Sequence, residues 1–172
     1  FDLVIVDLYP FEETVKKTDD PAQIIEKIDI GGISLIRAGA KNFNEVVIVP
    51  DSKYYLEFME LYKNQNGCTS IEDRKRFAKY AFATSSHYDG MIYDWFAKDD
   101  DASDLNIHID NRSELRYGEN PHQKAVFYGK LDEIFEKLHG KDLSYNNLLD
   151  LEAGLNLIRE FEEPTFAILK HN

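Results

Sequence analysis

Residues 2–8 read D-L-V-I-V-D-L, a short apolar run that is rich in valine and leucine. Such a run is typical of a buried strand in a parallel sheet, and the rest of the predicted fold follows from it. Tyr9-Pro10-Phe11 ends the strand because proline has no N–H to donate to a neighbouring strand. Tyr9 thus stands at the carboxyl end of a parallel strand, where α/β proteins bind ligands. Packing of Tyr9 beside Phe11 is the alternative interpretation.

Helical and strand patterns alternate after this first strand. Asp20 followed by Pro21 is typical of a helix N-cap and its first turn. Thr69-Ser70-Ile71-Glu72 has the form of a capping box, and apolar residues recur after it at helical spacing. The predicted helices cover about residues 21–27, 32–40, 52–63 and 70–97, and a second buried strand covers residues 46–49. This alternation predicts an α/β fold with a parallel sheet for residues 1–97.

The predicted helix at residues 32–40 follows a pair of glycines, Gly31 and Gly32. Glycines at the start of a helix permit the close approach of another backbone, or of an anion, to the helix N-terminus. A tight turn is the other interpretation, and the glycine pair alone does not separate the two.

An acidic stretch at residues 98–104, K-D-D-D-A-S-D, marks the predicted domain boundary. The part that follows, residues 98–172, is also expected to be α/β. Its predicted strands cover residues 107–109, 125–128 and 164–169. Its predicted helices are a short one, with Phe135 and Leu138 at core positions, and a longer one from Asn146 or Asn147 through Phe161.

The stretch L-R-Y-G-E-N-P-H-Q at residues 115–123 combines side chains that packing alone does not explain. Gly118 permits a positive φ, and Pro121 fixes its own φ and disfavours the α region for the residue before it. We therefore predict a rigid, irregular loop that presents an arginine, a tyrosine, an asparagine and a histidine together. A polar turn between two strands is the alternative.

The chain carries 32 acidic and 20 basic residues, which give a net charge of −12. This charge argues against a nucleic-acid partner, because a phosphate backbone requires a basic face. It is compatible with a small phosphorylated substrate that is held by a few cations focused in one cleft. No apolar run approaches the roughly 20 residues of a membrane span, so none is expected.

The single cysteine, Cys68, excludes an internal disulfide and fits a reducing cytosol, so a cytoplasmic protein is expected. The five histidines and the cysteine show no ligand spacing, so no metal site is expected. The chain begins at Phe1 and both of its ends adjoin predicted core strands, which would leave ladder groups unpaired. The expectation is therefore a truncated piece of a longer protein.

Four stretches, in this order, are similar to motifs of one family. They are D-I-G-G-I-S-L-I-R-A-G-A-K-N at residues 29–42, R-Y-G-E-N-P-H-Q at residues 116–123, S-Y-N-N at residues 144–147 and K-H at residues 170–171. Together they resemble the bifunctional purine-biosynthesis enzymes AICAR transformylase/IMP cyclohydrolase. The resemblance implies a truncated methylglyoxal-synthase-like parallel-sheet domain at residues 1–97. It further implies the start of a cytidine-deaminase-like transformylase domain at residues 98–172.

In the cyclohydrolase half, the resemblance implies that Tyr9, Asp29 and Lys41 are catalytic and that Gly31 and Gly32 contact the substrate. A lysine, a tyrosine and an aspartate that share hydrogen bonds can move a proton and assist the loss of water during ring closure. A straight helix over residues 32–40 would be roughly 13 Å long, so Asp29 and Lys41 would be apart unless the substrate spans them or another element brings Lys41 back.

In the transformylase half, the resemblance implies that Lys170 and His171 are catalytic and that His122 assists them. The nucleotide contacts that it implies come from Arg116, Tyr117, Asn120 and Asn147. A lysine–histidine pair supplies a base for the attacking amine and an acid for the leaving nitrogen, provided that the site tunes both pKa values.

The function that the resemblance implies is the last two steps of de novo purine biosynthesis. These are formyl transfer from 10-formyltetrahydrofolate to AICAR and the cyclisation of formyl-AICAR to IMP. AICAR, formyl-AICAR/IMP and folate would be the ligands and a homodimer the assembly, and little of either activity is expected of the isolated chain. The alternatives are a non-catalytic regulatory α/β domain that binds a phosphorylated metabolite, and a dimerisation domain built on the helix at residues 70–97.

Overall fold

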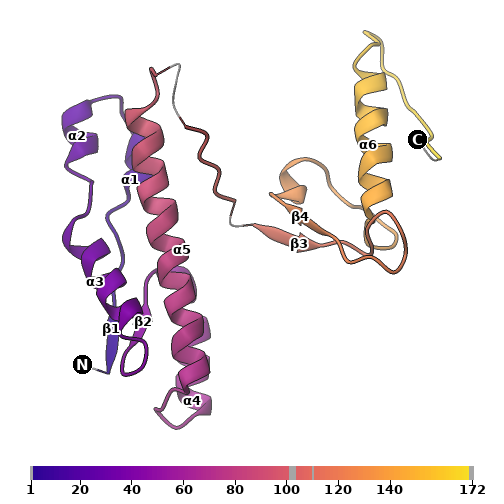
Figure 1. The fold of residues 1–172 in the computed structure, drawn as a ribbon. Coiled ribbons are helices and arrows are strands. Elements are labelled where there is room, and N and C mark those ends of the chain that lie inside the picture. The colour runs from indigo at the N-terminus through magenta and orange to yellow at the C-terminus, as the bar shows by residue number, and fades with distance from the viewer. Residues whose placement is uncertain (1, 101–103, 110, 171–172) are drawn as a thin grey trace. The chain divides into compact units, whose positions relative to one another are not determined.

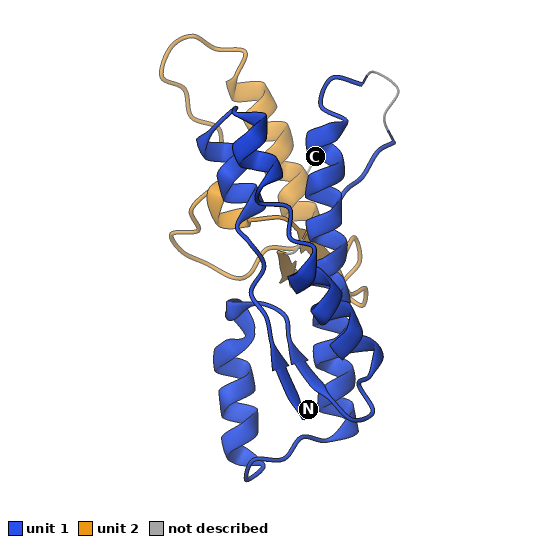
Figure 2. Ribbon diagram, turned by 90° about the vertical axis from the view of Figure 1, so that its left-hand side faces the viewer, with its two compact units in different colours: residues 1–108 blue, residues 109–172 orange. Residues whose placement is uncertain are grey.

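Two short parallel strands form the centre of the first half of the chain (Figure 1). Strand β1 (Leu3–Ile5) pairs with β2 (Val47–Val49), with Val4 opposite Ile48. A computed structural model describes residues 2–100, 104–109 and 111–170. The chain divides into two compact units, residues 1–108 and residues 109–172 (Figure 2). Each unit is described by itself below.

Helices follow the strands of unit 1 in the alternating order that the sequence predicts. They are α1 (Phe11–Lys17), α2 (Pro21–Ile25), α3 (Gly31–Lys41), α4 (Tyr55–Asn64) and α5 (Ile71–Phe96). A 3₁₀ turn at Ser52–Tyr54 leads into α4. The predicted cap is confirmed, since Asp20 Oδ1 accepts a hydrogen bond from Ala22 N at 3.0 Å. The parallel pair of strands and these helices confirm a mixed α/β fold with a small parallel sheet.

Strand β2 places its side chains alternately in two apolar clusters, as the pleat of a strand requires. Ile48 packs with Ile36 of α3 and with alanines of α5, whereas Val47 and Val49 pack with Phe58 of α4 and Phe77 of α5. Helices thus cover both faces of the sheet, and α5 contributes to both clusters. This arrangement buries β2 completely, as predicted.

Two sequence predictions for unit 1 are wrong in detail. Strand β1 was expected to be buried, but Leu3 is 37% exposed and Ile5 is 49% exposed, because β2 is its one neighbour among the described residues. The capping box of α5 lies one residue later than predicted. Ser70 is the N-cap and exchanges hydrogen bonds with Asp73. The prediction was displaced because Thr69 and Glu72 have the same spacing, a hydroxyl three residues before an acid.

Helix α1 has no counterpart among the predicted elements. Pro10, which the sequence marks as the end of a strand, is also its N-cap. Acidic residues lie in its first turn and basic residues in its last turn, which suits the helix dipole, and these residues form two i,i+4 ion pairs. Phe11 and Ile24 anchor α1 and α2 against the C-terminal half of α5, where they pack around Tyr88.

Unit 2 consists of a hairpin and one helix. Strand β3 (Arg112–Glu114) pairs antiparallel with β4 (Val126–Tyr128), and α6 (Tyr145–Ile158) follows a short 3₁₀ turn at Leu131–Glu133. Helix α6 ends three residues before the predicted Phe161. The predicted short helix is absent, and Leu138 is 82% exposed instead of being a core residue.

The predicted strands at residues 107–109 and 164–169 do not form, because no strand among the described residues lies beside either segment. The segment before Ile109 packs on α5 instead, where Asp104 N donates to Tyr93 Oη at 2.8 Å and the rings of His87 and His108 lie 4.5 Å apart. Leu169 packs on α6, close enough to Gly154 that a Cβ atom there would lie 2.3 Å from it.

Candidate functional site

The carboxylate of Asp29 connects the end of the first strand region to the start of α3. Its Oδ2 accepts a hydrogen bond from Tyr9 N at 3.3 Å, and its Oδ1 accepts one from Gly32 N at 2.6 Å. Asp29 is 8% exposed, so both oxygens are held in a largely dry site. The structure therefore brings together Tyr9, Asp29 and Gly32, three of the residues that the sequence analysis assigns to one site.

A tyrosine of α5 holds the turn that precedes α3. Tyr88 Oη accepts a hydrogen bond from Asp29 N and donates one to the Lys27 carbonyl, both at 2.8 Å. Burial raises the pKa of the Tyr88 phenol above its ordinary value, so the hydroxyl keeps its proton for the second bond. The Lys27 ammonium lies 5.6 Å from the centre of the Tyr9 ring, which places a cation and a phenol together.

The two glycines at the start of α3 differ in what surrounds them. A Cβ atom on Gly32 would lie 2.6 Å from Asp29 Oδ2, whereas a Cβ atom on Gly31 would have no atom within 4 Å. Gly32 is therefore required for the close approach of the Asp29 carboxylate to the helix N-terminus. Gly31 has no such packing reason and is exposed at the end of the helix, where an anion would interact with the helix dipole.

Lys41 is not part of this cluster. It is the exposed last residue of α3, whose 11 residues have a length of about 16 Å. Asp29 precedes the first turn of that helix, so the two side chains lie at its opposite ends. A ligand that contacts both residues must extend along α3.

In unit 2, the loop at residues 115–123 is closed on itself by hydrogen bonds. Gly118 N donates to the Gln123 carbonyl at 2.9 Å, and Asn120 N donates to Gln123 Oε1 at 2.7 Å. An irregular loop is thus present and, as the alternative interpretation has it, it connects two strands, β3 and β4, but its glycine has a different purpose. Gly118 is not among the residues with a positive φ, and it is buried with a would-be Cβ atom 3.1 Å from Gln123 Cβ.

This loop lies directly on the N-terminus of α6. Arg116 N donates to the Leu143 carbonyl at 2.7 Å, Tyr145 N donates to the Tyr117 carbonyl at 3.1 Å, and Asn146 Nδ2 donates to the Glu119 carbonyl at 3.0 Å. Two motifs that are more than twenty residues apart in the sequence thus form one surface. We call this surface, residues 115–123 with residues 144–147, the loop–helix site.

Ser144 organises the helix side of the loop–helix site. It is fully buried and forms a capping box with Asn147: Asn147 N donates to Ser144 Oγ at 3.4 Å, and Ser144 N donates to Asn147 Oδ1 at 3.1 Å. The prediction that Asn146 or Asn147 caps the helix is therefore wrong about the N-cap residue itself. Asn147 retains its amide nitrogen as a donor, because only its oxygen is used in the box.

Arg116 and Tyr117 form the polar face of the loop–helix site. The Arg116 guanidinium donates to Tyr117 Oη at 3.1 Å and lies 4.8 Å from the centre of the Tyr117 ring. Hydrogen bonding from the Ser144 hydroxyl, and then from Arg116, holds the pKa of the Tyr117 phenol below its ordinary value. A guanidinium and an acidified phenol side by side suit the recognition of an anionic group.

Of the proton-transfer residues predicted for this site, two are described, His122 within the loop itself and Lys170 at the end of the last described segment of the chain. His122 is exposed, and among the described residues no group makes a hydrogen bond with its ring. Lys170 is also exposed, at the end of the segment that packs on α6 through Leu169. His171 lies outside the described residues.

Sequence reasoning missed three residues that hold these sites together, namely Tyr88, Gln123 and Ser144. Tyr88 is 59 residues from Asp29, and no local pattern relates them. Ser144 could have been recognised as a helix cap from the sequence, because an asparagine follows it three residues later and an apolar run comes next. No group of three or more potential metal ligands occurs among residues 2–100, 104–109 and 111–170.

Comparison with known proteins identifies the same family that the four sequence motifs resemble. A family model described as the AICARFT/IMPCHase bienzyme matches residues 39–172. The bifunctional purine biosynthesis protein PurH of Bacteroides thetaiotaomicron is 54% identical over 171 residues, which cover 99% of this chain and 34% of the relative. The PurH proteins of Microcystis aeruginosa and Rhodospirillum rubrum are 46% and 45% identical, over 99% of this chain and about 35% of their own lengths. The chain therefore spans about a third of the length of the curated relatives it matches.

Proposed function

The chain belongs to the AICARFT/IMPCHase bienzyme family, and from this premise we propose that it contributes residues to two active sites of a purine-biosynthetic enzyme. One site transfers a formyl group from 10-formyltetrahydrofolate to AICAR, and the other closes formyl-AICAR to IMP. The names of its relatives support both the enzyme class and the pathway. The chain spans about a third of their length, so the activities are proposed for a protein of full family length.

The observation that carries this proposal is the loop–helix site. The R-Y-G-E-N-P-H-Q loop and the S-Y-N-N helix start are separate in sequence, yet two hydrogen bonds join them, and a third joins Arg116 N to the carbonyl of Leu143, the residue before the helix start. Their shared surface presents the Arg116 guanidinium, the Tyr117 phenol and the amide nitrogen of Asn147. These groups can donate hydrogen bonds to a nucleotide without moving, which reduces the cost of binding.

In the formyl transfer, the 5-amino nitrogen of AICAR attacks the formyl carbon while the bond from that carbon to N10 of the folate breaks. The amine must lose a proton and N10 must gain one, so the reaction requires a base and an acid near each other. We assign these roles to Lys170 and His171, with assistance from His122. Arg116, Tyr117, Asn120 and Asn147 bind and orient the nucleotide.

In the cyclisation, the carboxamide nitrogen attacks the formyl carbon of the same molecule and water leaves. We assign the proton transfers to Tyr9 and Lys41, and we assign Asp29 a positioning role as well. Its carboxylate fixes Tyr9 N and Gly32 N, and therefore sets the start of α3 relative to the tyrosine. The substrate extends along α3 from Gly31 to Lys41 in this arrangement, because these residues lie at opposite ends of the helix.

Further features of the family are part of the same proposal. Residues 1–97 would form a portion of a methylglyoxal-synthase-like domain, and residues 98–172 the start of a cytidine-deaminase-like domain. We propose a cytoplasmic homodimer that uses 10-formyltetrahydrofolate as cosubstrate and no metal. None of the described helices has an apolar stretch that could cross a bilayer.

A chimera tests the proposed function. Residues 1–172 replace the matching third of the Bacteroides thetaiotaomicron relative, with which they share 54% identity. The purified chimera is assayed for AICAR formylation with 10-formyltetrahydrofolate and, separately, for IMP formation from formyl-AICAR. Both activities are expected. A chimera that unfolds cooperatively like its parent, but shows neither activity, would contradict the proposal.

A further inference from the structure

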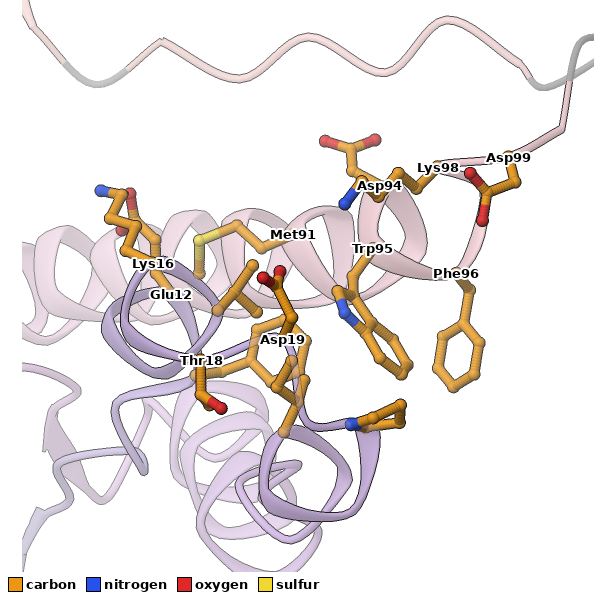
Figure 3. A pocket seen from close by; sticks show the side chains of 14 residues that line it. Glu12, Lys16, Thr18, Asp19, Met91, Asp94, Trp95, Phe96, Lys98 and Asp99 are labelled. Carbon is orange, nitrogen blue, oxygen red and sulfur yellow. The ribbon is translucent and has the colours of Figure 1, made fainter.

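Unit 1 contains a cavity that neither proposed reaction uses. It has a volume of about 830 Å³ and lies between α1, α2 and the C-terminal end of α5 (Figure 3). This volume is in the range of small-molecule binding sites, roughly 300–1,000 Å³. Its residues are not those of the Asp29 turn or of the loop–helix site.

The floor of the cavity is apolar and aromatic. Phe11 and Ile24 are almost fully buried beneath it, and the Trp95 indole stands edge-on to the Phe11 ring at a centroid distance of 6.4 Å. Phe96 forms one side and is 64% exposed. Aromatic faces of this kind attract organic cations as well as apolar groups.

The rim of the cavity is acidic. Four carboxylates and two ammonium groups line it, and one of each forms an ion pair, between Glu12 and Lys16 at 2.6 Å. The remaining carboxylates, of Asp19, Asp94 and Asp99, outnumber the single remaining ammonium group of the lining, on Lys98. Among the described residues, none forms a hydrogen bond or an ion pair with the carboxylate of Asp19. In Figure 3 this side chain projects toward Met91 and Trp95.

We propose that this cavity binds a small amphipathic organic cation, with an apolar or aromatic body and one amine or guanidinium group. The body packs on the more accessible Phe96 and Met91 side chains, above the buried Phe11 and Ile24, and the cation lies between the Asp19 carboxylate and the Trp95 ring. An anion would meet the excess negative charge of the rim, and a neutral molecule would gain no attraction from it. The charge of the cavity thus selects the sign of its ligand.

Trp95 is the only tryptophan of the sequence, so intrinsic tryptophan fluorescence reports on this cavity alone. The 172-residue chain is titrated with 4-phenylbutylamine, which is a cation at pH 7, with the neutral 4-phenylbutan-1-ol and with the anionic 4-phenylbutanoate. The amine is expected to bind about tenfold more tightly than the alcohol, and the acid more weakly than either. Calorimetric titration of the same three compounds provides a second readout that does not depend on quenching.

The Asp19→Asn variant is expected to lower the affinity for the amine about fivefold and to leave the affinity for the alcohol unchanged. Asp89→Asn, on an exposed position of the same helix α5, is the matched control and should change neither. Equal affinities for the three compounds, an unchanged amine affinity in Asp19→Asn, or no saturable amine binding by either readout would overturn the proposal.

Discussion

The Asp29 carboxylate accepts a hydrogen bond from Gly32 N at 2.6 Å, and it lies where a side chain on Gly32 would have to be. The same carboxylate accepts from Tyr9 N, so one buried side chain fixes the end of the first strand region and the beginning of α3. The Asp29 carboxylate both positions helix α3 and faces the proposed substrate, so a small displacement of it is expected to affect both. The stability of unit 1 and the geometry of its site are therefore linked at this turn.

The two glycines of this turn give the first prediction. Gly32→Ala should lower the free energy of unfolding by about 1–3 kcal/mol, because the Asp29 carboxylate must move and leave two backbone N–H groups unpaired. Gly31→Ala is the matched control, since its new methyl group meets nothing, and it should be neutral or stabilising by up to about 1 kcal/mol. Urea unfolding measures both. Equal stabilities of the two variants would show that the carboxylate does not hold the turn.

The capping box of α5 gives a prediction about pH. Burial alone would raise the pKa of Asp73, but hydrogen bonds from Ser70 and Gln65 and the charge of Arg76 outweigh it and hold this pKa below its ordinary value of 3.8. A carboxyl whose pKa is lowered by folding stabilises the protein above its unfolded pKa, and this contribution disappears as the pH falls through the folded pKa.

Asp73→Asn should therefore cost about 1–2 kcal/mol at pH 7. The difference from the parent chain should remain constant down to about pH 5 and then shrink below 3.8. Unfolding by urea between pH 3 and pH 7 measures this difference, with Asp89→Asn as the control on the same helix. A difference that does not depend on pH would mean that the charge of Asp73 contributes nothing.

The loop–helix site gives a third prediction. Ser144→Ala removes the N-cap of α6 and should destabilise unit 2 by about 1 kcal/mol. It should also raise the pKa of the Tyr117 phenol toward its ordinary value, because the Ser144 hydroxyl is the largest cause of the lowering. Chemical shifts of ¹³C-labelled tyrosine, followed between pH 7 and pH 11, report this change.

Ser113→Ala, in strand β3, is the control for that titration and should leave the Tyr117 pKa unchanged. If Ser144→Ala also left it unchanged, the Ser144 hydroxyl would not be a partner of the phenol. Tyr117 could then not be assigned as a hydrogen-bond donor beside Arg116 whose pKa is lowered by Ser144.

The sequence predicted those parts of the fold whose cause is local. The buried strand β2, the Asp20 cap and the long helix α5 each follow from neighbouring residues, and the structure confirms them. The capping box of α5 was displaced by one residue because Thr69-x-x-Glu72 and Ser70-x-x-Asp73 have the same pattern. Interactions outside this pattern, from Gln65 and Arg76 to Asp73, distinguish the second.

What the sequence did not predict depends on contacts between distant residues. Nothing near Tyr88 indicates that its hydroxyl bridges the backbones of Lys27 and Asp29. Residues 164–169 have the apolar composition of a strand, but a strand requires a neighbour, and in the described part of the chain none is beside them. The family resemblance is confirmed by the comparisons, whereas the roles of the individual site residues remain predictions.

We propose that this chain supplies separate residues to two active sites, and single substitutions in the chimera with the Bacteroides thetaiotaomicron relative distinguish the two. Arg116→Ala and Lys41→Ala are introduced one at a time, since both residues are exposed, with Lys124→Ala and Lys63→Ala as matched controls. Formylation of AICAR and cyclisation of supplied formyl-AICAR are measured for each variant. Arg116→Ala is expected to lose at least tenfold in formylation alone and Lys41→Ala at least tenfold in cyclisation alone, each about 1.4 kcal/mol or more of transition-state stabilisation. Equal losses of both activities in either variant, or no loss in both, would contradict the proposal.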